Sequence, residues 1–291
     1  MLCVILPTGV FAQSVALTFD DGLDPRNTPQ AAAWNAAILE ALAAGGIHAT
    51  LFAAGVQVDS PAGMTLVRDW GRAGHEVANH TYSHLDFNSR DTSLARFTAD
   101  VERDTALLRE VPGWTPRFRF PYLKEGDTAA KRDGMRGWLK RHQFGSGAVS
   151  IDASDWYYDQ RYASWRAAHP GADPAPFRAA YLDHLWNRAN YCDALSWRVL
   201  RRGARHVLLL HSRAINAEFL PDIIAMFRAR GWSIISPAQA YEDPLYAMRP
   251  RTLPAGESIL WALAKQSGVN GLRYPAEDEI YEKPILDGLG L

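Results

Sequence analysis

The sequence predicts an α/β fold in which about seven parallel strands form a distorted or incomplete (β/α) barrel. Short apolar runs alternate along the chain with longer segments of helical character, as in consecutive β–α units. Polar residues suited to catalysis follow several of these runs directly, and a βα-barrel builds its active site at the carboxyl ends of its strands. Seven units are fewer than the eight of a standard barrel, and a doubly wound open sheet is the competing architecture.

The predicted strands are short and rich in aliphatic residues. Such runs are typical of parallel strands whose two faces are both buried. We expect strands at residues 15–19, 47–53, 75–79, 117–120, 144–151, 206–210 and 232–235.

The predicted helices lie between these strands. Residues 29–44 are rich in alanine, have apolar residues at helical spacing, and stop at Gly45 and Gly46. Further helices are expected at residues 61–73, 91–111, 128–142, 177–202, 215–230 and 237–241. We expect residues 156–176 to form a long, irregular, aromatic-rich stretch.

The character of the chain changes at residue 244. Proline, glycine and charged residues dominate from there on, with one short helical stretch near 257–266. We therefore expect one domain over residues 14–243 and a C-terminal extension over 244–291, which packs on the barrel or extends the rim of the site.

The composition excludes some classes of partner. The 291 residues are 47% hydrophobic and 22% charged, which is enough apolar material for a large core. A net charge of −1 gives no general attraction to nucleic acid, and we see no apolar run of the roughly 18 residues that a membrane helix needs. The sequence does not indicate the oligomeric state.

The first 13 residues have the apolar character of a signal peptide remnant, cut near Ala12 or Gln13. This interpretation predicts a secreted or periplasmic protein. It would leave Cys192 without Cys3, so no internal disulfide could form. The alternative is that the segment is a first buried strand.

Asp20 and Asp21 follow the first predicted strand, and Gly22 allows a tight turn after them. Because adjacent side chains on an extended chain point in opposite directions, one aspartate can hold a metal while the other faces a substrate. His80 and His84 are spaced to meet on one helical turn or tight loop. With one aspartate they form a ligand set for catalytic zinc. The same set suits iron(II) in an oxygenase, but the β–α alternation does not resemble the jelly-roll fold usual for such sites.

Five clusters at strand ends resemble, in their order along the chain, the five motifs of the polysaccharide deacetylases. These are the NodB-homology enzymes of carbohydrate esterase family 4. The clusters are Thr18-Phe19-Asp20-Asp21-Gly22, His80-Thr81-Tyr82-Ser83-His84, Arg119-Phe120-Pro121-Tyr122, Asp152-x-x-Asp155-Trp156 and Leu209-Leu210-His211. The resemblance covers residues 14–241, and its first two motifs are the most specific.

The resemblance implies a NodB-like barrel and a hydrolase that acts on carbon–nitrogen bonds other than peptide bonds. It would remove acetyl groups from an N-acetylated polysaccharide, peptidoglycan or a chitin-like oligomer, with metal-activated water. The implied cofactor is a divalent metal, usually zinc, for which cobalt or nickel can substitute. The implied partner is the acetylated glycan.

The resemblance also implies a role for each matching residue. The implied metal ligands are Asp21, His80 and His84. Asp20 would be the general base, oriented by Arg119, and His211 would be the general acid, held by Asp155. These roles agree with the needs of amide hydrolysis, since the departing amine requires a proton and a carboxylate favours the charged form of a histidine.

Three further residues would shape the substrate pocket. By the same resemblance, Trp156 and Leu209 would contact the acetyl methyl group, and Tyr122 would supply a backbone N–H to the oxyanion. The family's third motif often has a glycine soon after its proline, whereas Pro121 is followed here by Tyr122. The oxyanion donor is therefore the least constrained of these assignments.

Two other functions stay open at this point. An O-acetyl esterase acting on xylan would share the metal chemistry. An inactive carbohydrate-binding barrel is the alternative of another class, and the intact set of base, ligands and acid argues against it. A serine hydrolase is disfavoured because we find no Gly-x-Ser-x-Gly motif.

Overall fold

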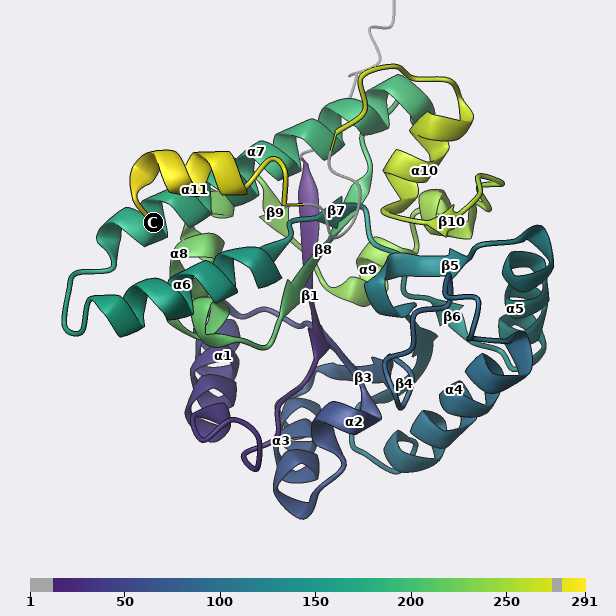
Figure 1. The fold of residues 1–291 in the computed structure, drawn as a ribbon, viewed down its shortest axis with the longest axis horizontal. Helices are drawn as coiled ribbons and strands as arrows, with labels where there is room; N and C mark the ends of the chain where they lie inside the picture. Colours follow the sequence, from purple (N-terminus) through teal and green to yellow (C-terminus); the bar gives the residue numbers. More distant parts are fainter. Residues whose placement is uncertain (1–12, 274–278) are drawn as a thin grey trace, which may run out of the picture.

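A curled parallel β-sheet lies at the centre of the fold, with helices packed around it (Figure 1). The computed structural model describes residues 13–273 and 279–291. In spatial order, the strands are β6 (Gly145–Ser146), β4 (Trp114–Phe118), β3 (Glu76–Asn79), β2 (Thr50–Ala53), β1 (Ser14–Asp21), β8 (Arg205–His211) and β7 (Ile151–Asp152). Neighbouring strands pair in parallel, and β9 (Ser233–Ile234) pairs with the start of β1. The predicted distorted, incomplete (β/α) barrel of about seven parallel strands is confirmed, in place of a doubly wound open sheet.

β1 is an interior strand of the sheet that pairs with β2, β8 and β9, and every one of its residues is buried. Aliphatic residues suit this position because both faces of the strand are covered. The register of β1 with β8 places Asp20 opposite His211, and its register with β2 places Asp21 opposite Ala53. The carboxyl ends of these strands therefore bring residues from distant parts of the sequence to one place.

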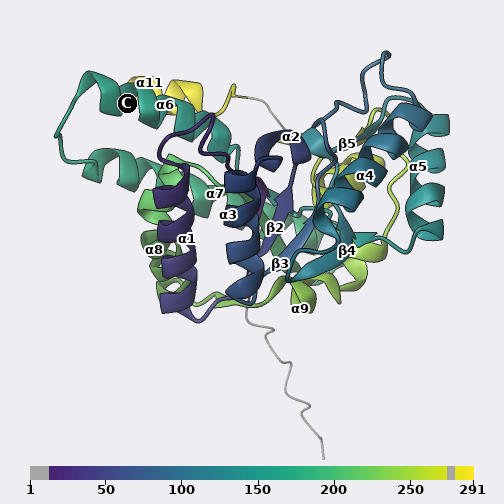
Figure 2. The ribbon, with the colours of Figure 1, turned by 90° about the horizontal axis from the view of Figure 1, so that it is seen from below.

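The helices form an outer layer. They are α1 (Ala31–Gly45), α2 (Gly55–Val58), α3 (Pro61–Arg72), α4 (Leu94–Leu108), α5 (Ala129–Arg141), α6 (Asp155–Ala168), α7 (Ala175–Leu200), α8 (Ala214–Ala229) and α9 (Pro237–Tyr241). α1 lies between α8 and α3, as Figure 2 shows. α3, α4 and α5 begin after Ser60, Ser93 and Thr128, whose hydroxyls each accept a backbone N–H of the first turn.

The prediction of one strand over residues 144–151 is wrong, because this segment forms two short strands, β6 and β7. After β6, the backbone N–H of Gly147 still donates to the carbonyl oxygen of Phe118, the last residue of β4, whereas the N–H of Ser150 donates to that of Val207 on β8. The segment thus forms one edge strand of the sheet, β6 beside β4, and then the other edge strand, β7 beside β8. It crosses the seam of the incomplete barrel, and this change of partner interrupts the strand.

The prediction of an irregular stretch over residues 156–176 is also wrong, because α6 covers Asp155–Ala168. Tyr158 and Tyr162 lie four residues apart, which places them on one face of a helix. Both tyrosines are buried and pack against Phe177 of α7. Their spacing was a helix signal.

The C-terminal segment packs against the barrel. The 3-10 turn η1 (Pro121–Leu123) leads into β5 (Lys124–Gly126), and the 3-10 turn η2 (Pro244–Ala247) precedes β10 (Ala255–Gly256). β10 pairs with β5, and α10 (Ile259–Gln266) packs on α7. Gly256 has φ of 120°, and a Cβ there would lie 2.0 Å from the carbonyl oxygen of Leu123. Glycine is therefore required at this contact.

The last helix, α11 (Lys283–Leu289), lies beside α6 in both views (Figures 1 and 2). The Nη1 atom of Arg161 on α6 donates to Oδ1 of Asp287 on α11 at 2.6 Å. The expected leader remnant, residues 1–13, falls almost wholly outside the described residues. Among the helices of the described part, none is long and apolar enough to cross a membrane.

Candidate active site

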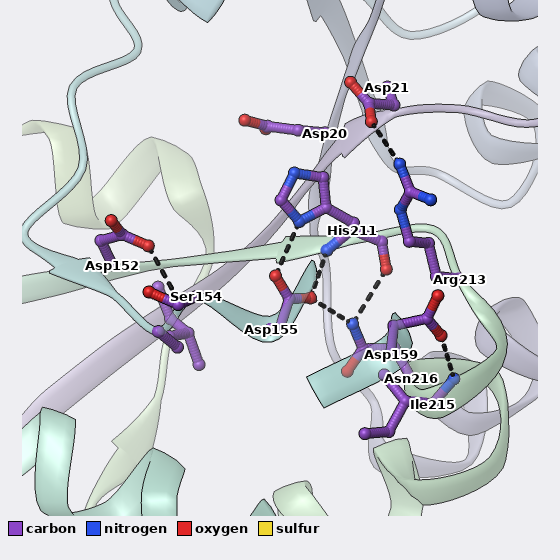
Figure 3. Close-up of polar contacts among 12 residues, drawn as sticks. Asp20, Asp21, Asp152, Ser154, Asp155, Asp159, His211, Arg213, Ile215 and Asn216 are labelled. Atoms are coloured by element: carbon purple, nitrogen blue, oxygen red, sulfur yellow. Dashed lines mark hydrogen bonds and ion pairs between the residues drawn. The ribbon is translucent and has the colours of Figure 1, made fainter. Parts of the chain in front are cut away.

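Asp20 and Asp21 end β1, and both carboxylates are buried. Asp21 has φ of 75° and Gly22 has φ of 86°, so the chain turns sharply where the strand stops. Figure 3 shows the two carboxylates pointing apart. The turn also needs glycine, because a Cβ on Gly22 would lie 2.5 Å from Cγ1 of Val58.

Asp21, His80 and His84 form a cluster whose ligand atoms all lie within 4.8 Å of one another. The Nε2 atom of His84 lies 3.4 Å from Oδ1 of Asp21, and that of His80 lies 4.0 Å from the same oxygen. The two histidines come together in a tight loop after β3, in which Thr81 and His84 have positive φ. The structure therefore assembles the predicted two-histidine, one-carboxylate set.

The donors of this cluster suit a divalent cation. Oδ1 of Asp21 is buried and accepts no hydrogen bond from the residues that the structure describes. Nδ1 of His80 lies 3.0 Å from the carbonyl oxygen of Arg119, so the Nδ1–H donates there and Nε2, which lies 4.0 Å from Oδ1 of Asp21, keeps its lone pair. Burial lowers the pKa of His80 well below its usual range and also lowers that of His84, which favours the neutral form needed in a ligand.

The charge of Asp21 also suits a metal ligand. Burial alone would raise its pKa, but His211, the two cluster histidines and Arg213 together lower it to about 2. The carboxylate is therefore ionised at neutral pH. Two neutral imidazoles and one carboxylate match the three-ligand pattern of catalytic zinc sites.

Asp20 is held by a buried arginine. Nη1 of Arg119 donates to Oδ1 of Asp20 at 2.5 Å, and Nη2 donates to the hydroxyls of Thr18 and Tyr241 at 2.9 and 3.2 Å. The second carboxylate oxygen, Oδ2, lies 3.6 Å from Nε2 of His80. Burial raises the pKa of Asp20 to about 6 against the pull of Arg119. Asp20 can therefore exchange a proton near neutral pH.

His211 and Asp155 form a hydrogen-bonded pair on the other side of the site (Figure 3). Nδ1 of His211 lies 2.6 Å from Oδ1 of Asp155, and the His211 backbone N–H donates to Oδ2 at 2.7 Å. Asn216 also donates to Oδ2, at 2.7 Å. Burial disfavours the charged imidazole, but the carboxylates of Asp155, Asp21 and Asp20 together outweigh it and raise the pKa of His211 to about 9. The pair can supply a proton at neutral pH.

Asp20, His211 and the Asp21–His80–His84 cluster all line one cavity of about 490 Å³. Its lining residues include the three ligand residues, Asp20 and His211, and also the three predicted substrate contacts, Tyr122, Trp156 and Leu209. Tyr122 has φ of 56°, and its ring packs edge-on against His84 with the centroids 4.5 Å apart. Its role as an oxyanion donor stays a prediction.

A larger cavity of about 910 Å³ lies between α5 and the C-terminal segment. Among the described residues, its lining shares only Leu123 with the smaller cavity. The larger cavity touches Arg119 but none of the other predicted catalytic or ligand residues. The smaller cavity is therefore the candidate active site.

The prediction from sequence missed three residues that hold this site: Arg213, Asn216 and Tyr241. Arg213 follows His211 by two residues, and its Nη2 donates to Oδ2 of Asp21 at 3.2 Å (Figure 3). A cationic residue so close in sequence to a strand-end motif could have indicated a contact with the site. Tyr241 is far from Arg119 in sequence, so only the folded chain reveals their contact.

Comparison with known proteins shows what this chain is similar to. Residues 10–138 match the family described as polysaccharide deacetylase. A chitooligosaccharide deacetylase of Sinorhizobium fredii is 41% identical over 156 residues, which are 51% of this chain and 62% of the relative. A peptidoglycan-N-acetylglucosamine deacetylase of Bacillus cereus is 29% identical over 143 residues, covering 49% of this chain and 46% of the relative. The chain thus spans about half to three-fifths of the length of these relatives.

Solved structures share the fold. A family 4 carbohydrate esterase from Streptomyces lividans, in complex with acetate, superposes with a TM-score of 0.52 at 24% identity, over 78% of this chain and 95% of the other. A mutant of a family 4 pseudoenzyme superposes with a TM-score of 0.55 at 18% identity, over 79% of this chain and 68% of the other. Because active and inactive proteins share the fold, the site residues must carry any argument about activity.

Proposed function

Because residues 10–138 match the polysaccharide deacetylase family, we propose that the chain hydrolyses the acetamido groups of an N-acetylated glycan, either peptidoglycan or a chitin-like oligomer. One observation supports the proposal most: a carboxylate base, a complete ligand cluster and a proton donor all face the same cavity. The relatives named above are described as acting on peptidoglycan or chitooligosaccharides, which favours N-deacetylation over the removal of O-acetyl groups from xylan.

The proposed cofactor is a divalent cation, with zinc as the first choice, held by Asp21, His80 and His84. When bound there, it would act as a Lewis acid that makes water nucleophilic near neutral pH and polarises the acetyl carbonyl. Cobalt or nickel could take the same three donors.

Asp20 acts as the general base in this proposal. Arg119 engages Oδ1, so Oδ2 is the atom placed to take a proton from the attacking water. A pKa of about 6 leaves this carboxylate largely ionised at neutral pH. Thr18 and Tyr241 fix the guanidinium that orients Asp20, so the base has one preferred position.

His211 acts as the general acid. Asp155 holds Nδ1, so Nε2 faces the cavity and donates its proton to the departing amine nitrogen. The new carbon–oxygen bond and the broken carbon–nitrogen bond then give acetate and a free amino sugar. Leu209 and Trp156, which line the same cavity, surround the small apolar methyl group of the acetyl substituent in this proposal.

The products provide the test. Metal-loaded protein is incubated with N-acetylglucosamine oligomers, peptidoglycan fragments and acetylated xylan, and the products are analysed by mass spectrometry. The proposal expects loss of acetyl groups from one of the first two substrates, with one new free amine for each acetate. Acetate release from xylan alone would contradict N-deacetylation and favour the esterase. No release from any of the three, with metal bound, would favour the binding-only barrel.

A secreted or periplasmic location also belongs to this proposal. Its support is the apolar opening segment in the sequence and the extracytoplasmic position of peptidoglycan and chitin. Cell fractionation of the tagged chain in a bacterial host tests it. Protein confined to the cytoplasm would contradict this location.

A further inference from the structure

Asp155 and His211, called the acid pair below, come from different elements. The loop that leads into Asp155 is connected through buried contacts to a residue of the C-terminal segment. The loop runs from Asp152 to Asp155, and Ser154 within it has φ of 47°, a conformation that residues other than glycine rarely adopt. Such a conformation persists only where the surroundings enforce it. Ser154 directly precedes Asp155, so its position determines where the carboxylate meets His211.

Two side chains of α7 hold this loop. Nη2 of Arg188 donates to Oγ of Ser154 at 3.0 Å. Nε2 of His184 lies 2.6 Å from the carbonyl oxygen of Ala153 and donates to it. Arg188 is fully buried, so the direction of its guanidinium depends on the charged groups around it.

Glu282, immediately before α11, is the carboxylate that pairs with this arginine. Its Oε1 accepts a hydrogen bond from the same Nη2 of Arg188, and both side chains are fully buried. Asp152, which lines the active-site cavity, also attracts Arg188 electrostatically. Glu282 and Asp152 therefore both attract one guanidinium, and we expect the removal of Glu282 to change the position of this guanidinium against Ser154.

We propose that Glu282 is a positioning residue for the acid pair, acting through Arg188 and Ser154 on Asp155 and His211. The C-terminal segment is then part of the catalytic apparatus, although it lies far along the chain from the strand-end motifs. The inference rests on the proposed function for the role of His211, while the contacts that carry it are independent of that role.

The test compares Glu282→Gln with Asp287→Asn. Asp287 lies on α11 and pairs with Arg161 and Lys283 at the surface, so it controls for charge loss in the same segment. We expect Glu282→Gln to lower kcat between ~10- and ~100-fold with little change in KM, because small misplacements of a catalytic group have effects of this size. Asp287→Asn should keep the wild-type kcat.

A second readout does not depend on turnover. The proton between His211 Nδ1 and Asp155 Oδ1 should give a downfield resonance in the proton NMR spectrum of the full chain. We expect Glu282→Gln to shift or broaden this resonance, and Asp287→Asn to leave it in place. A folded Glu282→Gln variant with wild-type kcat and an unchanged resonance would overturn the inference.

A double variant separates positioning from stability. Glu282→Leu with Arg188→Met removes both partners of the buried ion pair together and keeps the volume filled, while Asp152 loses the attraction of Arg188. Because the ion pair is removed as a whole, we expect a melting temperature near that of the wild type. Because the donor to Ser154 is lost with Arg188, we expect kcat to stay reduced. A double variant with wild-type kcat would overturn the inference. If the wild type releases no acetate, the proposed function fails, and the NMR comparison still tests whether Glu282 positions the acid pair.

Discussion

Asp20 on β1 lies directly opposite His211 on β8 in the register of the parallel sheet. Two strands that are far apart in sequence thus bring the proposed base and the proposed acid to one edge of the sheet. Their surroundings separate their pKa values, because burial raises that of Asp20 to about 6 and Asp155 helps to raise that of His211 to about 9. Such a pair can hold complementary protonation states at neutral pH.

The pH dependence of kcat/KM should therefore be bell-shaped. Asp20 must be ionised, so the rate falls as the pH drops through about 6, and His211 must be protonated, so the rate falls as the pH rises through about 9. Acetate release across this range measures both limbs. A rate that keeps rising well above pH 9 would exclude His211 as the acid.

Asp155→Asn should move the alkaline limb of that profile to lower pH. The Asp155 carboxylate favours the charged imidazole of His211, and an amide at this position supplies no negative charge. Asp159→Asn is a matched control, because Asp159 is a buried carboxylate on the same helix that accepts from the Ile215 N–H. An alkaline limb that stays in place in Asp155→Asn would contradict the pairing.

Asp20→Asn should separate the base from the ligands. We expect turnover to fall between ~100- and ~10,000-fold, the usual range for loss of a general base, while the metal content stays near one per chain. Asp21→Asn should instead lose the metal. Elemental analysis of both purified variants checks this, and comparable metal loss in Asp20→Asn would contradict the division of roles.

Arg119→Met should shift the acid limb of the profile upward. Arg119 holds the pKa of Asp20 down against burial, so its loss allows that pKa to rise further. Tyr241→Phe keeps the ion pair and removes one hydrogen bond to the guanidinium, which makes it the milder control. If both variants have the same acid limb as the wild type, Asp20 is not the titrating base.

Gly256→Ala should destabilise the fold. The added methyl group would meet the Leu123 carbonyl, and φ of 120° is unfavourable for alanine. We expect a loss of about 1–3 kcal/mol in the free energy of unfolding, which lowers the melting temperature by several degrees. Gly288→Ala is the control, since a Cβ there meets nothing within 4 Å. Equal melting temperatures would show that the β5–β10 contact contributes little.

Much of the fold could be predicted from the sequence because each strand has a local pattern of apolar residues. The apolar run before Asp20 and the aliphatic run before His211 identify their strands without knowledge of the partners. The break between β6 and β7 was not predictable in this way, since it depends on pairing first with β4 and then with β8. A pattern within residues 144–151 carries no information about those partners.

The same limit applies to the candidate site. The residues at strand ends are grouped by the geometry of a parallel sheet, so their proximity could be predicted from their positions alone. Tyr241 ends a helix and Glu282 immediately precedes one, so neither has a strand-end signal, and they contact Arg119 and Arg188 across long stretches of chain. Long-range contacts between helices and loops depend on packing that periodicity does not encode.

Chelator-sensitive acetate release is the measurement that tests the central claim most directly. The zinc-loaded chain is assayed on N-acetylglucosamine oligomers, then stripped with a chelator, and then reloaded with zinc. The proposed metal-dependent deacetylase predicts release that disappears on stripping and returns on reloading, with one free amine for each acetate. Release that is unchanged in the stripped protein, with the metal shown to be absent, would contradict it.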